Sequence, residues 1–438
     1  MRISSIRTAG FKRIEQLEVN PGSINIITGR NNTGKTSFLE SIDTAFNPQN
    51  IGRFSENLNK IININSKTSS ISANYIQTQQ TLDKYSSSGN NTTTRELAIR
   101  EPRKDEAVEI FVQALQDIIE LNKDYPVRIP AYADIFDENE IGKRIQDSSE
   151  EAISTLSKNQ ILPEARENMI IIEIDGKEYP YIHLGDFYDD IREMIVEEAT
   201  VILRKKLDTS DIISEPPEEK KHDVEYLLDR GFHEQFVPRF GSNRFVGGEP
   251  PSVEGVRMVG SPILEAEDID MDQPNAGRKR SDIEEYLREN DILENLVDFS
   301  FDKIVFKEDG SKDEIPYSLM GDGFKTLVGI LWEVIDDNRR ENILLLEEPD
   351  VHMHPGYVEN LLTQLVGIIR KNNIQIFITT HNPDLIEGFF SNVLKSKEKG
   401  FLQKSFKLIQ LTDPIPRTID YESAENEIKE LNVDLRGI

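Results

Sequence analysis

The stretch Gly29-Arg30-Asn31-Asn32-Thr33-Gly34-Lys35-Thr36 decides the fold, because it matches the pattern G-x-x-x-x-G-K-[ST] of a phosphate-binding loop. The apolar run at 23–27 predicts a buried strand before the loop, and the helical spacing of residues 37–42 predicts a helix after it. In this order, the N–H groups of the loop and the positive end of the helix converge on phosphates. These flanks favour nucleotide binding over the alternative, an ordinary glycine-rich turn.

The side chains of this loop predict how a nucleotide is held. Lys35 is expected to neutralise the β- and γ-phosphates of ATP, and the Thr36 hydroxyl is expected to ligate Mg²⁺. The expected cofactors are therefore ATP and Mg²⁺. The residues predicted to bind the nucleotide from this loop are Gly29, Asn31, Asn32, Thr33, Gly34, Lys35, Thr36 and Ser37.

Two consecutive carboxylates follow a second apolar run far along the chain. Residues 342–346 predict a buried strand whose C-terminal end carries Glu347 and Glu348. Ligands of open α/β sheets bind at that edge, so we expect Glu347 to join Thr36 around Mg²⁺. Glu348 is expected to orient and deprotonate the attacking water. The alternative, two idle solvated acids, is disfavoured by the presence of the phosphate-loop motif.

Two further motifs lie on either side of the acidic strand. Residues 375–379 predict the next strand, after which His381 is expected to hydrogen-bond the γ-phosphate, with a structural histidine as the alternative. Gly321 and Gly323 lie where a helix is predicted to begin. Because helix N-termini bind anions, these glycines are candidates for a second phosphate contact, with a simple helix cap as the alternative. The predicted catalytic residues are Lys35, Glu348 and His381.

The order of these motifs resembles that of the ABC-type ATPases of the SMC and RecF branch: phosphate loop, long insertion, signature turn, acidic strand, switch histidine. Residues 344–355 and 378–381 look like the OLD-like members, often described as AAA-type or ATP-binding. The resemblance covers 1–48 and 234–438 and implies an α/β ATPase head, a mixed β-sheet with helices. It also implies a head-to-head homodimer with two ATPs at its interface, in which Gly321 and Gly323 serve the nucleotide of the partner.

The same resemblance implies a function. OLD-like proteins occur in phage-defence and DNA-maintenance systems, so we expect an ATPase whose dimer acts as a sensor or regulator with a separate effector protein. The sequence departs from the pattern at Met320, where a Ser is usual, and at Glu347, where an Asp is usual. From the short stretch after His381 we expect no TOPRIM nuclease segment. Met320 leaves an alternative open, a scaffold that ATP locks without productive hydrolysis.

The chain between the two matching parts predicts an insertion at 49–233 that is mainly helical. A low-complexity stretch rich in Ser, Thr, Asn and Gln at 63–94 predicts a loop, with residues 71–76 as a candidate strand beside it. Asp175-Gly176 predicts the turn of a hairpin at 169–179. The third part, 234–438, completes the ATPase head. Other expected segments are helices at 105–122, 148–156 and 186–206, a strand at 236–240 and a polar loop at 247–275.

Composition limits the partners of the protein. The 438 residues include 79 acidic and 51 basic side chains, a net charge of −28, which disfavours nucleic acid as a partner because binding it requires phosphate neutralisation. The basic triplet at 278–280 is interpreted as an exposed loop that balances nearby acids rather than as a DNA contact. No apolar stretch approaches the ~18 residues of a membrane span, and cysteine is absent. We therefore expect a cytoplasmic protein without a membrane partner.

Overall fold

The structure is a computed structural model, and its chain divides into two compact units. Unit 1 comprises Met1–Pro48, Ser70–Glu96 and Ser252–Ile438, and unit 2 comprises Gln49–Ser69 and Leu97–Pro251. The division expected from sequence (1–48, 49–233 and 234–438) stays a prediction, because the chain around residue 233 lies outside the described residues. The structure describes residues 1–76, 92–122, 138–156, 167–183, 193–195, 197–202, 205, 243–260, 263–271, 275–289, 293, 295–308, 311–334, 343–351, 353–391, 394, 396–412 and 416–429.

The centre of unit 1 is a six-stranded sheet in the order β16-β15-β3-β14-β13-β9. All neighbouring strands are parallel except the β15–β16 pair, which is antiparallel. The register pairs Glu347 with Thr379 and Thr379 with Ile27, so β13, β14 and β3 end at one edge. The strands are β3 (Ile24–Gly29), β9 (Val256–Val259), β13 (Ile343–Glu347), β14 (Gln375–Thr379), β15 (Phe406–Leu411) and β16 (Arg417–Asp420).

Helix α1 (Lys35–Phe46) lies between this sheet and the antiparallel strands β1 and β2. On one side, the rings of Phe38 and Phe377 of β14 meet edge to face at 6.4 Å. On the other side, the hydroxyls of Ser41 and Thr8 of β1 are 3.0 Å apart. Because α1 is covered on both sides, nearly all of its residues are buried. The antiparallel strands of unit 1 are β1 (Arg2–Phe11), β2 (Ile14–Val19), β4 (Thr68–Ile76) and the start of β5 (Thr92–Arg100).

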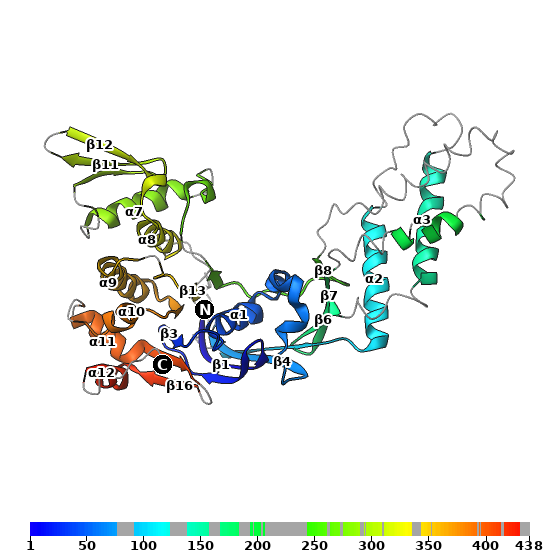
Figure 1. Cartoon of the computed structure of the whole chain (residues 1–438), viewed down its shortest axis with the longest axis horizontal. Helices are drawn as coiled ribbons and strands as arrows, with labels where there is room; N and C mark the ends of the chain where they lie inside the picture. The colour runs from blue at the N-terminus through cyan, green and yellow to red at the C-terminus, as the bar shows by residue number, and fades with distance from the viewer. Residues whose placement is uncertain are drawn as a thin grey trace, which may run out of the picture. The chain divides into compact units, whose positions relative to one another are not determined.

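The opposite face of the parallel sheet is covered by helices from the C-terminal half of the chain, drawn from olive to red in Figure 1. The apolar face of α9 (Pro355–Asn372) is buried, because each of its six residues is at most 2% exposed: Val358, Leu361, Leu362, Leu365, Val366 and Ile369. The other helices of this group are α8 (Asp322–Val334), α10 (Pro383–Gly388), α11 (Ser396–Ser405) and α12 (Tyr421–Lys429).

An aromatic cluster anchors the segment that leads into α8. Tyr317 is fully buried, packs edge to face against Phe301 at 5.5 Å, and donates its hydroxyl to Leu264 O at 2.8 Å. On α8, Lys325 donates to both carboxylate oxygens of Glu265 at 2.8 Å. The elements of this region are η2 (Ala266–Asp268), α7 (Ala276–Glu289), β10 (Leu296–Phe299), β11 (Lys303–Glu308), β12 (Ser311–Pro316) and η3 (Tyr317–Leu319).

Unit 2 combines a sheet with two long helices. Its strands pair in the order β5-β6-β7-β8, and the predicted hairpin is confirmed, since Asp175 and Gly176 have the positive φ values of 50° and 83° that its turn requires. Helices α2 (Lys104–Asn122) and α3 (Glu138–Leu156) lie side by side (Figure 1). The remaining elements are η1 (Pro48–Ile61), β6 (Met169–Ile174), β7 (Lys177–His183) and β8 (Asn243–Phe245).

The mixed α/β class is confirmed, whereas a mainly helical insertion is not established, because its described part holds strands as well as helices. Two local predictions are wrong. The loop expected at 247–275 contains β9, a short strand that pairs with β13. The loop expected at 63–94 is shorter, because β5 extends into it and because β4 includes the candidate strand at 71–76, which is thereby confirmed. Residues 77–91, most of 186–206 and the strand expected at 236–240 lie outside the described residues.

The basic triplet at 278–280 lies in helix α7 rather than in a loop, which corrects its interpretation. Lys279 Nζ lies 5.0 Å from the centre of the Trp332 ring. Arg280 donates to Phe299 O at 3.2 Å, and Arg278 lies 3.8 Å from the carboxylate of Asp282. Each of the three cations therefore has a partner within the chain.

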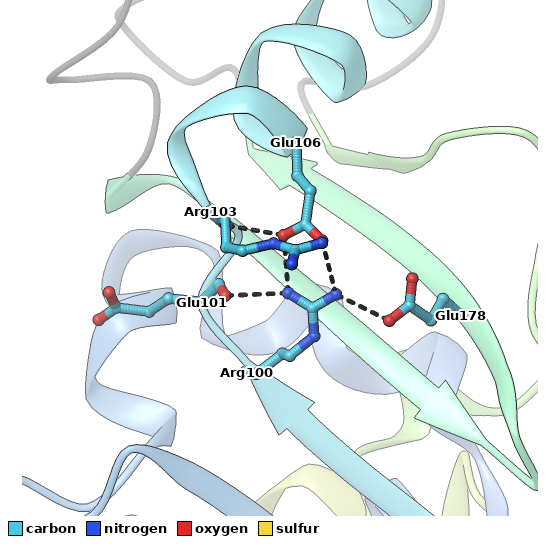
Figure 2. A network of polar contacts seen from close by, with 5 residues as sticks. All are labelled: Arg100, Glu101, Arg103, Glu106 and Glu178. Atoms are coloured by element: carbon cyan, nitrogen blue, oxygen red, sulfur yellow. Dashed lines mark hydrogen bonds and ion pairs between the residues drawn. The ribbon is translucent and has the colours of Figure 1, made fainter.

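An ion network fixes the start of α2 to the strands of unit 2 (Figure 2). Arg100 of β5 donates to both carboxylate oxygens of Glu106 at 2.8 and 3.0 Å and to Glu178 of β7 at 2.7 Å. Glu106 also accepts from the backbone N–H of Arg103 at 2.7 Å, as the third helical residue does in a capping box. These hydrogen bonds, led by that from Arg100, lower the pKa of Glu106 to about 2.

We predict that Glu106→Gln destabilises unit 2 by about 1 to 2 kcal/mol at pH 7, because it removes a charged acceptor of several hydrogen bonds. The pKa of Glu106 is lower in the folded state than its ordinary value of 4.5, so its contribution exists above that value and is lost as the pH falls toward about 2. Chemical denaturation followed between pH 7 and pH 3 measures this.

The matched control is Glu109→Gln, which makes the same charge change at an exposed position of α2. This control is expected to match the wild type. A Glu106→Gln variant as stable as the control at pH 7 would show that the network does not hold α2.

Candidate functional site

The phosphate loop adopts a backbone that requires its two glycines. Gly29 has φ 151°, and a Cβ there would lie 2.5 Å from Leu411 O and 2.7 Å from the Thr33 hydroxyl. Gly34 has φ 98° and ends the loop at the first turn of α1, where a Cβ would lie 3.3 Å from Ile14. Neither position accepts a larger residue without a shift, and both conformations favour glycine. The loop is therefore held at both ends by neighbouring strands.

Lys35 places its ammonium group inside this loop. Its side chain is buried, and Nζ donates to Gly29 O at 3.2 Å and to Arg30 O at 3.1 Å. Burial lowers the pKa of Lys35, and the nearby carboxylate of Glu348 opposes this shift. A charged amine that the protein has partly removed from water interacts strongly with an anion that enters the loop.

Thr36 and Glu347 form the second contact of the site. The Thr36 hydroxyl donates to Glu347 Oε1 at 2.5 Å, which joins the start of α1 to the end of β13. A hydroxyl and a carboxylate are the hard oxygen ligands that Mg²⁺ prefers, and Mg²⁺ commonly completes its shell with phosphates and water. Within the described parts of the chain, no group of three or more His, Cys, Asp or Glu side chains is placed to hold a metal. Thr36 and Glu347 thus fit a metal that binds together with a phosphate ligand.

Glu348 and His381 form the third contact. His381 Nε2 lies 2.8 Å from Glu348 Oε1, and both side chains are about one third exposed, at 37% and 34%. The backbone of Glu348 has a positive φ of 41°, and its N–H donates to the carbonyl and hydroxyl of Thr379 at 3.1 and 3.0 Å. Burial and the charge of Lys35 lower the pKa of His381, opposed by Glu348. The lowered pKa favours the neutral imidazole, whose Nε2 lies within hydrogen-bond distance of the carboxylate.

The structure brings most of the predicted residues together, and no hydrogen bond or ion pair of the described residues joins them to the signature turn. Lys35, Thr36, Glu347, Glu348 and His381 are joined by the contacts described above. Asn31 and Asn32 are exposed in the loop, Thr33 donates to Arg30 O at 2.9 Å, and Ser37 is buried in α1. The two glycines Gly321 and Gly323 lie at the start of α8, where Gly321 O accepts from the N–H groups of Phe324 and Lys325.

Sequence reasoning missed the turn between β1 and β2 as a neighbour of the phosphate loop. Lys12 in this turn has a positive φ of 48° and pairs with Glu40 of α1 at 2.6 Å. A Cβ at Gly34 would lie 3.5 Å from Arg13 Cβ. Both contacts join residues that are distant in sequence, so no local pattern indicates them.

A phosphate loop that enters a helix beside the acidic end of a parallel strand defines a P-loop nucleotide-binding domain. The family model described as "AAA domain, putative AbiEii toxin, Type IV TA system" matches residues 65–387, more than half of the chain. The chain belongs to this family, and the predicted relationship to ABC- and SMC-like ATPases is confirmed. The matched segment begins after the phosphate loop, which the family match therefore does not include.

Individual relatives match shorter segments. The uncharacterized protein MJECL11 of Methanocaldococcus jannaschii is 29% identical over 123 residues, 27% of this chain and 100% of that protein. An ATP/GTP phosphatase of Helicobacter pylori is 29% identical over 143 residues, 31% of this chain and 38% of that protein. The Septu protein PtuA of Bacillus mycoides is 24% identical over 130 residues, 25% of this chain and 18% of that protein. The last two alignments thus span less than half of those relatives.

Among solved structures, the SMC head domain from Thermotoga maritima aligns over 96% of this chain and 99% of its own length, with a TM-score of 0.39 and 11% identity.

Within the described residues, no helix is both long and apolar enough to span a membrane.

We predict that Lys35→Ala weakens ATP binding about 30-fold or more, because it removes the buried ammonium group that would meet the phosphates. Isothermal titration with Mg²⁺ and a non-hydrolysable ATP analogue measures this affinity. Lys404→Ala removes the same charge from an exposed position of α11 and is expected to bind like the wild type. Equal affinities of Lys35→Ala and the wild type would show that the loop does not hold the nucleotide.

Proposed function

We propose that this chain binds and hydrolyses ATP and that two copies associate through their ATP sites. One observation carries the proposal: the phosphate-loop residues Lys35 and Thr36 meet Glu347 and the Glu348–His381 pair at one edge of the parallel sheet. A phosphate-binding lysine, two hard oxygen ligands and a positioned carboxylate are the groups that ATP hydrolysis requires. Membership of an AAA-domain family and the similarity to an ATP/GTP phosphatase add support.

In the proposed reaction each side chain has a separate task. Lys35 would neutralise the terminal phosphates, and Thr36 and Glu347 would hold Mg²⁺, which would supply further charge neutralisation there. Glu348 orients a water molecule and accepts its proton as the water attacks the γ-phosphorus. The Nε2–H of His381 donates a hydrogen bond either to Glu348, which holds that carboxylate in place, or to a γ-phosphate oxygen of ATP.

The signature turn supports the dimer. Gly321 lies exposed at the start of α8, and a Cβ added there would meet no atom within 4 Å, so a helix N-terminus is accessible to an anion. This turn is not part of the bonded set around Lys35, and we propose that it contacts the nucleotide of a second copy. A ligand that binds only the paired state stabilises that state, so association would depend on ATP.

We further propose that the ATP-dependent dimer acts as a sensor or regulator in phage defence or DNA maintenance, together with a separate effector protein. The support is the resemblance to OLD-like proteins and the similarity to two proteins named Septu protein PtuA. The net charge of −28 continues to disfavour a direct nucleic-acid partner.

One observation favours a second candidate function, a scaffold that ATP locks without productive turnover. Met320 precedes the signature glycines, and its side chain packs against the hydrophobic core instead of presenting a hydroxyl to a nucleotide. In this candidate, ATP joins two copies and hydrolysis is incidental.

Turnover by the wild type and by Glu348→Gln separates these functions. We predict that Glu348→Gln binds ATP normally but hydrolyses it at about one hundredth of the wild-type rate or below, because the amide cannot accept a proton. The solution mass of this variant should double when ATP is added. Phosphate release and light scattering measure the two effects, and Glu359→Gln, an exposed position on α9, serves as the control.

Unchanged turnover in Glu348→Gln would remove this residue as the base. A wild type that binds ATP and doubles its mass without releasing phosphate would favour the scaffold instead.

A further inference from the structure

A buried carboxylate that has no role in the proposed chemistry lies next to the Glu348–His381 pair. Asp350 follows Glu348 by two residues in the turn after β13, and only 3% of it is exposed. Its Oδ2 accepts a hydrogen bond from the hydroxyl of Thr380 at 2.8 Å. The turn itself is closed by two backbone hydrogen bonds, from Val351 N to Glu348 O at 3.3 Å and from Met353 N to Asp350 O at 3.1 Å.

Thr380 is the residue directly before His381, and three hydrogen bonds hold it. Besides its bond to Asp350, its N–H donates to Ile27 O of β3 at 3.0 Å, and its hydroxyl oxygen accepts from the N–H of Asn382 at 2.9 Å. Asn382 in turn accepts from Asp384 N at 2.9 Å and so begins α10. His381 therefore lies between two neighbours whose backbones are fixed.

These contacts form a closed ring. The chain runs from Glu348 to Asp350, a hydrogen bond joins Asp350 to Thr380, the chain continues to His381, and His381 returns to Glu348 at 2.8 Å. The two links differ in exposure, because Asp350 and Thr380 are buried whereas Glu348 and His381 are about one third exposed. A buried hydrogen bond is little weakened by water, so the inner link is the more rigid of the two.

We propose that Asp350 and Thr380 are positioning residues that set the geometry of the Glu348–His381 pair. This inference rests on the proposed function, since it gives the inner link a role in ATP hydrolysis. Together with the hydrogen bonds from the Glu348 N–H to Thr379, the inner link fixes the position of the turn after β13 relative to the segment after β14. The imidazole of His381 is consequently preorganised next to Glu348. This contact keeps the carboxylate of Glu348 in the orientation that the reaction requires.

The chemistry of Asp350 argues against a purely structural role. Burial raises the pKa of this carboxyl above its ordinary value, which the hydrogen bond from Thr380 opposes, so the ionised form is costly to keep inside the protein. An apolar pair of similar shape would stabilise the turn at least as well. A carboxylate and a hydroxyl instead impose one direction and one distance on the two segments that carry the reacting groups.

Thr380→Val tests the inference, because it removes the hydroxyl and keeps the shape of the side chain. We expect kcat for ATP hydrolysis to fall roughly 10- to 100-fold while KM stays within about threefold, since the loop that binds the phosphates is not altered. Thr380→Ser restores the hydroxyl and should restore kcat. Thr363→Val on α9, whose hydroxyl bonds only a carbonyl of its own helix, is the matched control for the loss of a threonine hydroxyl.

A double variant separates positioning from general stability. If Thr380 acts through the pair, Thr380→Val should lower kcat little further once His381→Gln has removed the imidazole. The same fold-loss in both backgrounds, or a wild-type kcat in Thr380→Val, would overturn the inference. A wild type without any ATP turnover would instead remove the proposed function itself, so the two failures are distinguishable.

Discussion

The candidate site depends on the parallel pairing of β3, β14 and β13. This register brings the ends of three strands to one edge, where the phosphate loop follows β3, His381 follows β14 and the two glutamates follow β13. The strands themselves are buried and mainly apolar, and Asn25 of β3 donates to Ile376 O of β14 at 3.0 Å, which helps to fix their register. The hydrogen bond between Thr36 and Glu347 then joins α1 to this edge, which unites segments from both ends of the chain.

Those parts of the fold that a local pattern determines could be predicted from the sequence. The loop at 29–36 carries its own glycines and lysine, and the apolar spacing of α9 indicates both its helix and its buried face. The strand β9 could not be predicted, because four residues between polar segments become a strand only by pairing with β13. The hydrogen bond between Asp350 and Thr380 was also beyond sequence reasoning, because it joins distant residues that belong to no recognised motif.

The separation between the signature turn and the other site residues is informative for the proposed dimer. The start of α8 is held in place by buried Tyr317 and by the ion pair between Lys325 and Glu265, not by the phosphate loop. A turn that neighbouring elements hold in place, that exposes Gly321 and that lies outside the bonded set suits a contact with another molecule. The proposal that this molecule is the nucleotide of a second copy accounts for the exposure of Gly321.

The most direct test of the central claim is Mg²⁺-dependent phosphate release from ATP by the wild type, measured beside the Lys35→Ala variant prepared in the same way. If the contacts around Lys35, Glu347 and Glu348 form an ATPase site, the wild type releases phosphate only with Mg²⁺ and the variant releases almost none. Equal release by both proteins would contradict the account, because the hydrolysis would then come from elsewhere.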